Sequence, residues 1–121
     1  MQSKINTDNR THEIVDKLRL ELRRGALPLA VLAQLREEHY GYSLRKHLNT
    51  KGLEIDEGTL YPLVRRLEKQ GLLSSEWRQD EKRKKRFYRI TELGEEVLVL
   101  LVGKWQTLNE SINGILGKER K

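Results

Sequence analysis

The chain has 121 residues, and its 24 Lys and Arg against 18 Asp and Glu give a net charge of +6. This length suits one domain with a helical appendage, and the absence of cysteine excludes a disulfide framework and a thiolate metal site. The longest apolar run, Val97–Val102, is far shorter than the roughly 20 residues of a membrane span, and Met1–Arg10 lacks the apolar core of a signal peptide. We therefore expect a cytoplasmic protein, whose basic excess favours a polyanionic partner because neutralised phosphates release counterions.

The N-terminal third is predicted to be helical after a disordered tail, Met1–Thr7. Within Asp8–Arg24, apolar residues recur at helical spacing, at Ile14, Val15, Leu18 and Leu22. Gly25 is expected to end or bend this helix. Ala26–Glu38 is apolar nearly all round, which predicts a second helix at the buried centre of the domain.

Two further helices are predicted in the middle of the chain. Apolar residues four apart indicate a short amphipathic helix over Tyr42–Thr50. Asp56 or Thr59 could cap the next helix through a side-chain oxygen, and that helix reaches about Gln70.

Beyond Gly71 the hydrophobic period changes from that of a helix to that of a strand. Alternating residues predict two short strands around the polar stretch Asp80–Lys85, which together form a β-hairpin. We expect Trp77, Phe87 and Tyr88 to lie in the core of this hairpin.

Thr91 is predicted to cap a last helix that reaches about Leu116. Apolar residues of this helix are spaced alternately three and four apart, as in a coiled-coil seam, at Leu98, Leu101, Trp105, Leu108, Ile112 and Ile115. We expect this seam to form a homodimer interface. The stripe of Ile14, Leu18 and Leu22 either packs on its own domain or clasps the partner's last helix, and its lack of a matching face favours the clasp.

The helix after Asp56 has two contrasting sides. A helical wheel places its apolar residues together, at Leu60, Leu63, Val64 and Leu67. The opposite side carries Pro62, Arg65, Arg66 and Lys69, with Thr59 and Tyr61 on the flanks. Such a helix fits the DNA major groove, where arginine pairs with guanine. Pro62 requires that the helix begin near Thr59 or kink.

An ordinary solvated face is the alternative interpretation of these cations. The preceding short helix and the following hairpin favour instead a helix-turn-helix with a wing. The hairpin supports this interpretation, because Lys82, Arg83, Lys84, Lys85 and Arg86 are consecutive cations that a phosphate backbone would neutralise. A flexible basic loop or a solubility feature would also explain that run.

The sequence also resembles the PadR family of transcriptional regulators. The resemblance covers about Leu20 to Leu101 and is carried by Leu22-Arg23-Arg24-Gly25, Gly58-Thr59-Leu60-Tyr61-Pro62-Leu63, Arg66-Leu67-Glu68-Lys69-Gln70-Gly71-Leu72 and Phe87-Tyr88-Arg89-Ile90-Thr91. It implies a dimer, usually a repressor, that binds pseudo-palindromic operator DNA. It further implies that Tyr42, Ser43 and Lys46 approach phosphates, whereas Thr59, Tyr61, Pro62 and Arg65 enter the major groove. The wing departs from the family, because Asp80–Lys85 lacks the usual glycine or proline.

The expected fold is therefore mainly α with a small β-hairpin. A winged helix-turn-helix domain with an N-terminal helix spans residues 8–91, and a long dimerisation helix spans 92–121. The expected function is that of a dimeric, sequence-specific transcriptional regulator that binds double-stranded DNA. A protein-interaction adaptor and a nonspecific nucleic-acid binder are the alternatives.

Two further expectations concern small molecules. Members of the family sense small planar molecules at the dimer interface, so Trp105 either fills the dimer core or contacts a small hydrophobic or aromatic effector, and packing is favoured. Neither a cofactor nor a catalytic site is expected. His12, His39 and His47 lack metal-ligand spacing, and no nucleophile motif is present.

Overall fold

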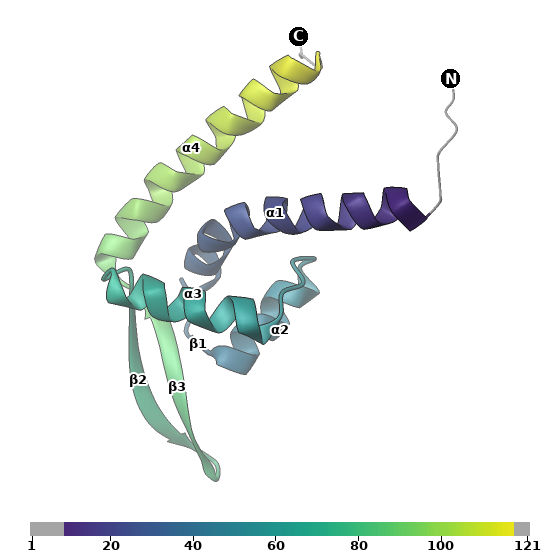
Figure 1. Cartoon of the computed structure of the whole chain (residues 1–121). Coiled ribbons are helices and arrows are strands. Elements are labelled where there is room, and N and C mark those ends of the chain that lie inside the picture. The colour runs from purple at the N-terminus through teal and green to yellow at the C-terminus, as the bar shows by residue number, and fades with distance from the viewer. Residues whose placement is uncertain (1–8, 118–121) are drawn as a thin grey trace.

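The computed structural model describes residues 9–117, so the predicted N-terminal tail lies outside the described residues. Within that range the chain is mainly helical with a small antiparallel sheet, as predicted (Figure 1). The elements in chain order are α1 (Asn9–Gln34), β1 (His39–Tyr40), α2 (Gly41–Thr50), α3 (Glu57–Lys69), β2 (Leu73–Asp80), β3 (Arg83–Ile90) and α4 (Glu92–Leu116).

Helix α1 is continuous from Asn9 to Gln34, so of the two alternatives predicted at Gly25, an end or a bend, the end is wrong. A Cβ added at Gly25 would meet nothing within 4 Å, and a glycine in a helix interior costs only about 1 kcal/mol relative to alanine. The helix also contains Pro28, which cannot donate a hydrogen bond to the Arg24 carbonyl. Neither local cost outweighs the packing that holds the second half of the helix.

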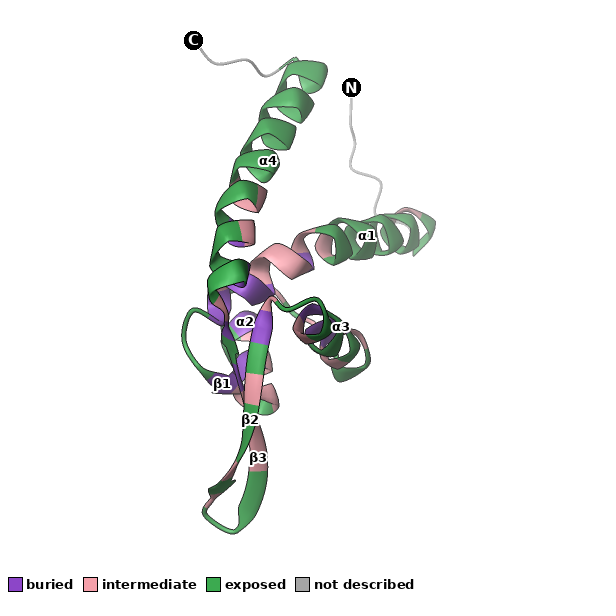
Figure 2. Ribbon diagram, turned by 90° about the vertical axis from the view of Figure 1, so that its left-hand side faces the viewer, coloured by how far each residue is buried: buried purple, intermediate pink, exposed green. Residues whose placement is uncertain are grey.

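The two halves of α1 differ in burial. The C-terminal half lies at the centre of the domain as predicted, where Leu27, Val31, Leu32 and Leu35 are buried. The N-terminal half extends away from the domain, and its apolar residues are exposed (Figure 2). Its apolar stripe therefore has no partner within residues 9–117.

The core lies between the second half of α1, helices α2 and α3, the sheet and the start of α4. Helix α3 contributes most to it, with Leu60, Leu63, Val64 and Leu67 all buried. Full burial of one leucine stabilises a fold by about 1.5–3 kcal/mol. This side of α3 is thus fixed to the domain, and its opposite side must face outwards.

The hairpin is longer and its turn tighter than the sequence predicts. Strands β2 and β3 pair from Leu73 opposite Ile90 to Asp80 opposite Arg83, which leaves a turn of two residues. Glu81 takes the left-handed φ of 58° that glycine would adopt more easily. This conformation lets the two strands connect without a glycine in the turn.

A third strand, β1, was not predicted. It pairs with β3 through His39 opposite Tyr88 and Tyr40 opposite Phe87. The expectation for the hairpin aromatics holds for Tyr88, which is buried, and only partly for Phe87, which is half-buried. It is wrong for Trp77, which is 59% exposed, because β2 continues beyond the end of the core.

Helix α4 begins as predicted, with Thr91 Oγ1 accepting a hydrogen bond from the Gly94 amide at 3.0 Å. Its first turns pack against the domain, and a Cβ on Gly94 would lie 2.2 Å from the Leu72 carbonyl oxygen. Leu98 is buried in the domain core, so its assignment to the dimer seam is wrong. A spacing of three and four does not distinguish a residue that packs on its own domain from one that faces a partner. Beyond Leu101, α4 projects from the domain as an exposed arm (Figure 2).

Candidate nucleic-acid interface

The exposed side of α3 carries the residues that the sequence places there. Pro62, Arg65, Arg66 and Lys69 are all exposed, and none of these cations forms a salt bridge within residues 9–117. They line a groove of about 600 Å³ between α3 and the hairpin, together with Glu68 and Arg86. Three unpaired cations along one side of a helix create a field that attracts polyanions.

Asp56 occupies the N-cap position of α3 in an extended conformation, but its side chain makes no capping hydrogen bond, so the prediction of a cap through a side-chain oxygen is wrong. Its carboxylate accepts a hydrogen bond from Thr59 Oγ1 at 2.9 Å, and this bond lowers the pKa of Asp56. Because the helix begins at Glu57, Pro62 lies in the second turn and not in the first as expected. Pro62 has no N–H, so the Gly58 carbonyl receives no helical hydrogen bond from it.

Tyr61 lies against the first residue of α2. A Cβ added at Gly41 would lie 3.1 Å from Tyr61 Cε1, so the glycine leaves room for the tyrosine ring. This close approach places Tyr61 on the flank of α3 that faces α2.

Helix α2 presents Tyr42 and Lys46 to solvent, on a surface that also includes Tyr40 and Lys51. Ser43, the third residue expected here, is half-buried and bonded within the domain. Its hydroxyl lies 2.7 Å from Nδ1 of His39, and its carbonyl oxygen accepts from Nδ1 of His47 at 2.9 Å. Of the three residues expected here, only Tyr42 and Lys46 are therefore exposed.

The five consecutive cations of the wing divide into two groups. Lys82, Arg83 and Lys84 are exposed at the tip and have no ion pair within the described part of the chain. Lys85 is half-buried, donates to Asp80 Oδ2 at 2.9 Å and lies 4.2 Å from the centroid of the Tyr40 ring. The hydrogen bond to Asp80 raises the pKa of Lys85. Only the tip cations are therefore fully available to a partner.

The base of the wing is held on both faces. On one face, Arg78 pairs with Glu38 and with Glu76 and lies 4.2 Å from the Phe87 ring centroid. On the other face, Arg86 donates to Glu68 of α3 at 3.0 Å and to Ser75 of β2 at 2.9 Å. Ser75 in turn donates to Glu68 at 2.6 Å. The cluster of Glu68, Ser75 and Arg86 was not predicted, because its members come from three different elements of the chain.

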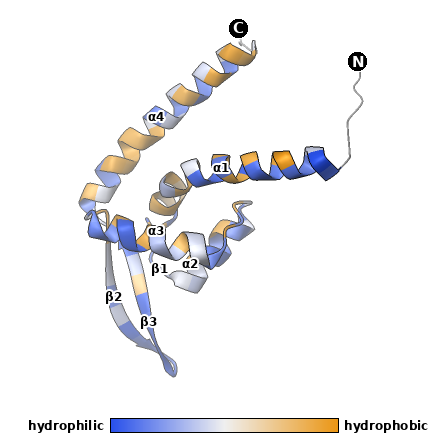
Figure 3. Ribbon diagram, viewed as in Figure 1, coloured by the Kyte–Doolittle hydropathy of each residue, from blue (hydrophilic) through white to orange (hydrophobic). Residues whose placement is uncertain are grey.

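The two long helices carry the apolar residues assigned to a dimer interface. On α1 these are Ile14, Leu18 and Leu22, and on α4 they are Trp105, Leu108, Ile112 and Ile115, all of them exposed. Leu101 is half-buried at the point where α4 leaves the domain. Colouring by hydropathy shows the apolar positions along both helices (Figure 3). These faces have no partner within residues 9–117.

No helix among the described residues is long and apolar enough to cross a membrane. Among residues 9–117, no group of three His, Asp or Glu side chains is arranged to hold a metal ion.

A helix that buries one side and presents cations on the other, preceded by α2 and followed by a cationic hairpin, defines a winged helix-turn-helix of the DNA-binding type. The chain belongs to the PadR-like family of transcriptional regulators, whose family model matches residues 29–99. Membership in this family indicates that the protein regulates transcription by binding DNA.

The chain is similar to several known proteins. It is 39% identical to a transcriptional regulator of Mycobacterium tuberculosis over 79 residues, which cover 64% of this chain and 74% of the relative. It superposes on the crystal structure of a PadR family regulator from Eggerthella lenta with a TM-score of 0.88 and 43% identity, covering 93% of this chain and all of that one. A PadR-like regulator from Bacillus cereus gives a TM-score of 0.72 at 30% identity, covering 82% of this chain and 99% of the other.

Proposed function

We propose that the protein is a cytoplasmic, homodimeric transcriptional repressor that binds pseudo-palindromic operator DNA. The observation that carries the proposal is the division of α3 into a buried side and an exposed side with Arg65, Arg66 and Lys69 unpaired. An α-helix with this charge distribution fits the major groove, where arginine reads guanine.

The residues take different roles in this complex. Thr59, Tyr61, Pro62 and Arg65 lie at the base edges, and Arg66 and Lys69 lie at the groove wall. Tyr42 and Lys46 contact the backbone on one side of the helix, whereas Ser43 contributes no contact because its hydroxyl is paired with His39. The wing tip contacts the backbone on the other side through Lys82, Arg83 and Lys84, and Lys85 contributes less because it is paired with Asp80. Phosphate contacts position the protein, and base contacts supply the sequence preference.

Homodimerisation is supported by the exposed apolar residues of α1 and α4. Burying an apolar side chain of this size stabilises an assembly by about 1.5–3 kcal/mol, so a row of them favours association. We assign the stripe of Ile14, Leu18 and Leu22 to the partner's α4, because it has no matching face in its own chain. Trp105 fills the centre of this interface, with an effector slot beside it as the second interpretation.

The experiment that tests the proposal is selection of bound duplexes from a random pool by the purified protein. A dimer predicts an inverted repeat with half-sites about 10 base pairs apart, centre to centre, or a multiple of that distance. Recovery of no inverted repeat would contradict the proposed operator.

Two other functions give different results. The affinity of a nonspecific nucleic-acid binder falls steeply with salt concentration. Its affinities for selected and for random duplex are nearly equal. A protein-interaction adaptor binds neither duplex. Measuring both affinities at one salt concentration therefore separates the three functions.

A further inference from the structure

Trp77 is an exposed aromatic residue in a strongly polar hairpin. Outside helices α1 and α4, Trp77 and Tyr42 are the only large apolar side chains among residues 9–117 that are exposed. The proposed dimer interface lies on α1 and α4 and does not include the hairpin, so it gives no reason for the exposure of Trp77. A single exposed apolar residue is common on protein surfaces, and its surroundings must therefore indicate its role.

The ring of Trp77 lies on the side of the hairpin that faces α3. Leu73 and Trp77 share one side of β2, and Leu73 at the base of that side is buried in the core. Arg86 stands directly opposite Trp77 on β3, with its guanidinium 5.7 Å from the centroid of the indole ring. The same guanidinium donates to Glu68 of α3. The ring is therefore held beside the DNA-facing helix before any partner binds.

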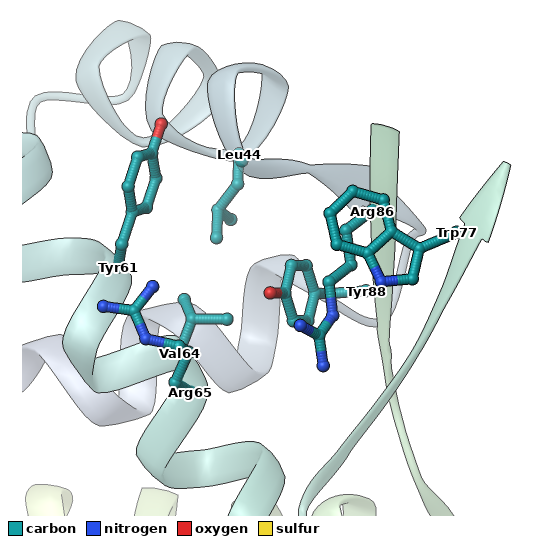
Figure 4. A pocket seen from close by; sticks show the side chains of 8 residues that line it. Leu44, Tyr61, Val64, Arg65, Trp77, Arg86 and Tyr88 are labelled. Atoms are coloured by element: carbon teal, nitrogen blue, oxygen red, sulfur yellow. The ribbon is translucent and has the colours of Figure 1, made fainter. Parts of the chain in front are cut away.

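Trp77 and two of the proposed DNA contacts border the same open cavity. This cavity has a volume of about 450 Å³ and lies between α2, α3 and the hairpin (Figure 4). Figure 4 shows Tyr61 and Arg65 on one side of the cavity and Trp77 on the other. Leu44 and Val64 add apolar surface to its lining. A DNA strand that passes between α3 and the hairpin therefore meets a cation on one side and an aromatic ring on the other.

The sugar is the part of a nucleotide that suits the Trp77 ring. In a duplex the bases are stacked on one another, so the ring could insert between them only at the cost of unstacking. The phosphates are attracted by the unpaired Arg65 and by the cations of the wing tip. Deoxyribose presents C–H groups between successive phosphates, and DNA-binding proteins contact it regularly. The uncharged indole ring is therefore left to pack against a sugar.

We propose that Trp77 is a further DNA-contacting residue, whose ring packs against a deoxyribose of the strand that passes between α3 and the wing. The contact adds affinity for every duplex, because all nucleotides of DNA carry the same sugar. It adds neither base preference nor salt dependence, because the ring touches no base edge and carries no charge. The inference rests on the proposed function in so far as the protein must bind duplex DNA, but it requires neither an operator nor a repressor role.

The first test compares the affinities of the unchanged full chain and of Trp77→Ala for the selected duplex and for a random duplex of equal length. We expect Trp77→Ala to weaken both by the same factor, about tenfold for each protomer, as for the loss of a partly buried aromatic contact. Trp77→Phe keeps a ring and should recover part of the loss. An unchanged affinity, or a loss confined to the selected duplex, overturns the proposal, because the latter would mean that the ring reads bases.

The salt dependence separates a direct contact from an effect on the cations of the wing. The slope of log affinity against log salt should be unchanged in Trp77→Ala, because no ion pair is lost. Lys82→Gln, in contrast, should lower the slope by about 1 for each Lys82 that contacts a phosphate. A slope lowered in Trp77→Ala as in Lys82→Gln would mean that the ring only positions the wing tip, and the proposal would be wrong.

Phe87 provides a matched control for the packing of the hairpin. It lies on the opposite side of β3 from the cavity, where its ring centroid is 4.2 Å from the Arg78 guanidinium. Phe87→Leu therefore alters the hairpin without altering the cavity, and it should leave the affinity for duplex unchanged. Equal losses in Trp77→Ala and Phe87→Leu would show that DNA binding needs the packing of the hairpin and not the Trp77 ring.

Fluorescence of the Trp105→Phe variant measures the burial of Trp77 directly, because the chain has two tryptophans. Acrylamide should quench Trp77 in the free protein, and most of this quenching should be lost once the anisotropy of a labelled duplex shows that the complex has formed. This measurement keeps the test decisive if Trp77→Ala fails to fold in thermal unfolding. Undiminished quenching in the complex overturns the proposal.

Failure of the proposed function gives a different result, which is seen in the unchanged protein. If the unchanged protein binds random duplex but selects no sequence, the operator proposal fails and the Trp77 contact is tested on random duplex. If the unchanged protein binds no duplex, both proposals are wrong. Failure of the Trp77 contact alone is seen only in the variants, with DNA binding by the unchanged protein intact.

Discussion

Arg86 on the hairpin donates a hydrogen bond to Glu68 on α3, at 3.0 Å, so the wing is tied directly to the helix that carries the unpaired cations. Ser75 bonds to both partners and completes the cluster. The angle between the wing and α3 is therefore held by side chains in addition to the backbone connection.

We expect Glu68→Gln and Arg86→Gln to be non-additive in the free energy of unfolding. Both side chains are about a third exposed or less, so solvent screening limits their coupling to about 0.5–1 kcal/mol. Urea unfolding of the two single variants and the double variant measures this coupling. Lys46→Gln combined with Glu68→Gln serves as the control and should be additive within about 0.3 kcal/mol. If the changes in the free energy of unfolding of the two single variants sum to that of the double variant, Glu68 and Arg86 do not hold the wing to α3.

Arg65→Ala and the wing tip should affect DNA binding differently. Arg65→Ala removes a base contact, so it should relax base preference at one position in each half-site. Changing Lys82, Arg83 and Lys84 together to glutamine should weaken all duplexes alike and lower the slope of log affinity against log salt by about 2–3. Lys85→Gln is the control and should have a smaller effect than any tip residue, because Lys85 is paired with Asp80. A wing variant that changed only base preference would contradict this division.

Leu108→Asp should convert the dimer to monomers. A charge in an apolar interface loses its hydration without gaining a partner, which costs several kcal/mol. Sedimentation velocity measures the change. Val99 is also exposed on α4 but lies about 180° around the helix from Leu108, so Val99→Asp should leave the dimer intact. Monomers from both variants, or from neither, would show that the seam has been misplaced.

Gly94→Ala should destabilise the domain, whereas Gly25→Ala should stabilise it. A Cβ on Gly94 would lie 2.2 Å from the Leu72 carbonyl oxygen and 2.6 Å from Ile90 Cγ1, so backbone must move, at about 1–3 kcal/mol. Gly25 lies in a helix with free space around it, and alanine there gains up to about 1 kcal/mol. Thermal unfolding of both variants shows whether each substitution lowers or raises the melting temperature. A stable Gly94→Ala variant would mean that α4 can withdraw from the hairpin base.

Stability should fall as the pH decreases below about 6.5, because of His39. Burial, followed by the nearby His47, lowers the pKa of His39 below its ordinary value of 6.5. The unfolded chain therefore takes up a proton before the folded chain does. The stabilisation is complete above pH 6.5 and is lost as the pH falls towards the lowered pKa. Nε2 of His39 accepts from the Gln34 amide at 3.0 Å, and a proton there would set two donors against each other.

Urea unfolding between pH 8 and pH 5 measures this loss. His39→Gln should flatten the profile whatever its own stability, because glutamine does not titrate. A His39→Gln profile as steep as that of the unchanged protein would assign the effect to another group.

Features set by one side chain could be predicted from the sequence. Thr91 caps α4 through its side chain, as predicted, and the two-sided pattern of α3 places Arg65 on the exposed side. The side-chain cap predicted for α3 is not formed, because the Asp56 carboxylate bonds to the Thr59 hydroxyl. The continuity of α1 through Gly25 could not be predicted, because it depends on the packing of Leu27 and Val31 further along. Leu98 was assigned to the wrong partner for the same reason.

The exposure of Trp77 depends on a different kind of information. Leu73, Ser75 and Trp77 share one side of β2, and the alternation predicts that they share an environment. In the structure Leu73 is buried, whereas Trp77 is exposed, because the strand continues past the end of α3. The lengths of the neighbouring elements determine the residue at which a strand leaves the core. The alternation of residues within the strand does not predict it.

Helix α4 belongs to two parts of the molecule at once. Its first turns are fixed in the DNA-binding domain through Gly94 and Leu98, and its last turns carry the seam of the proposed dimer. A helix of 25 residues is about 37 Å long, so each degree of tilt at one end moves the other by about 0.6 Å. Because α4 is rigid, a small change in the angle between the two α4 helices of a dimer would change the distance between the two DNA-binding domains along the DNA.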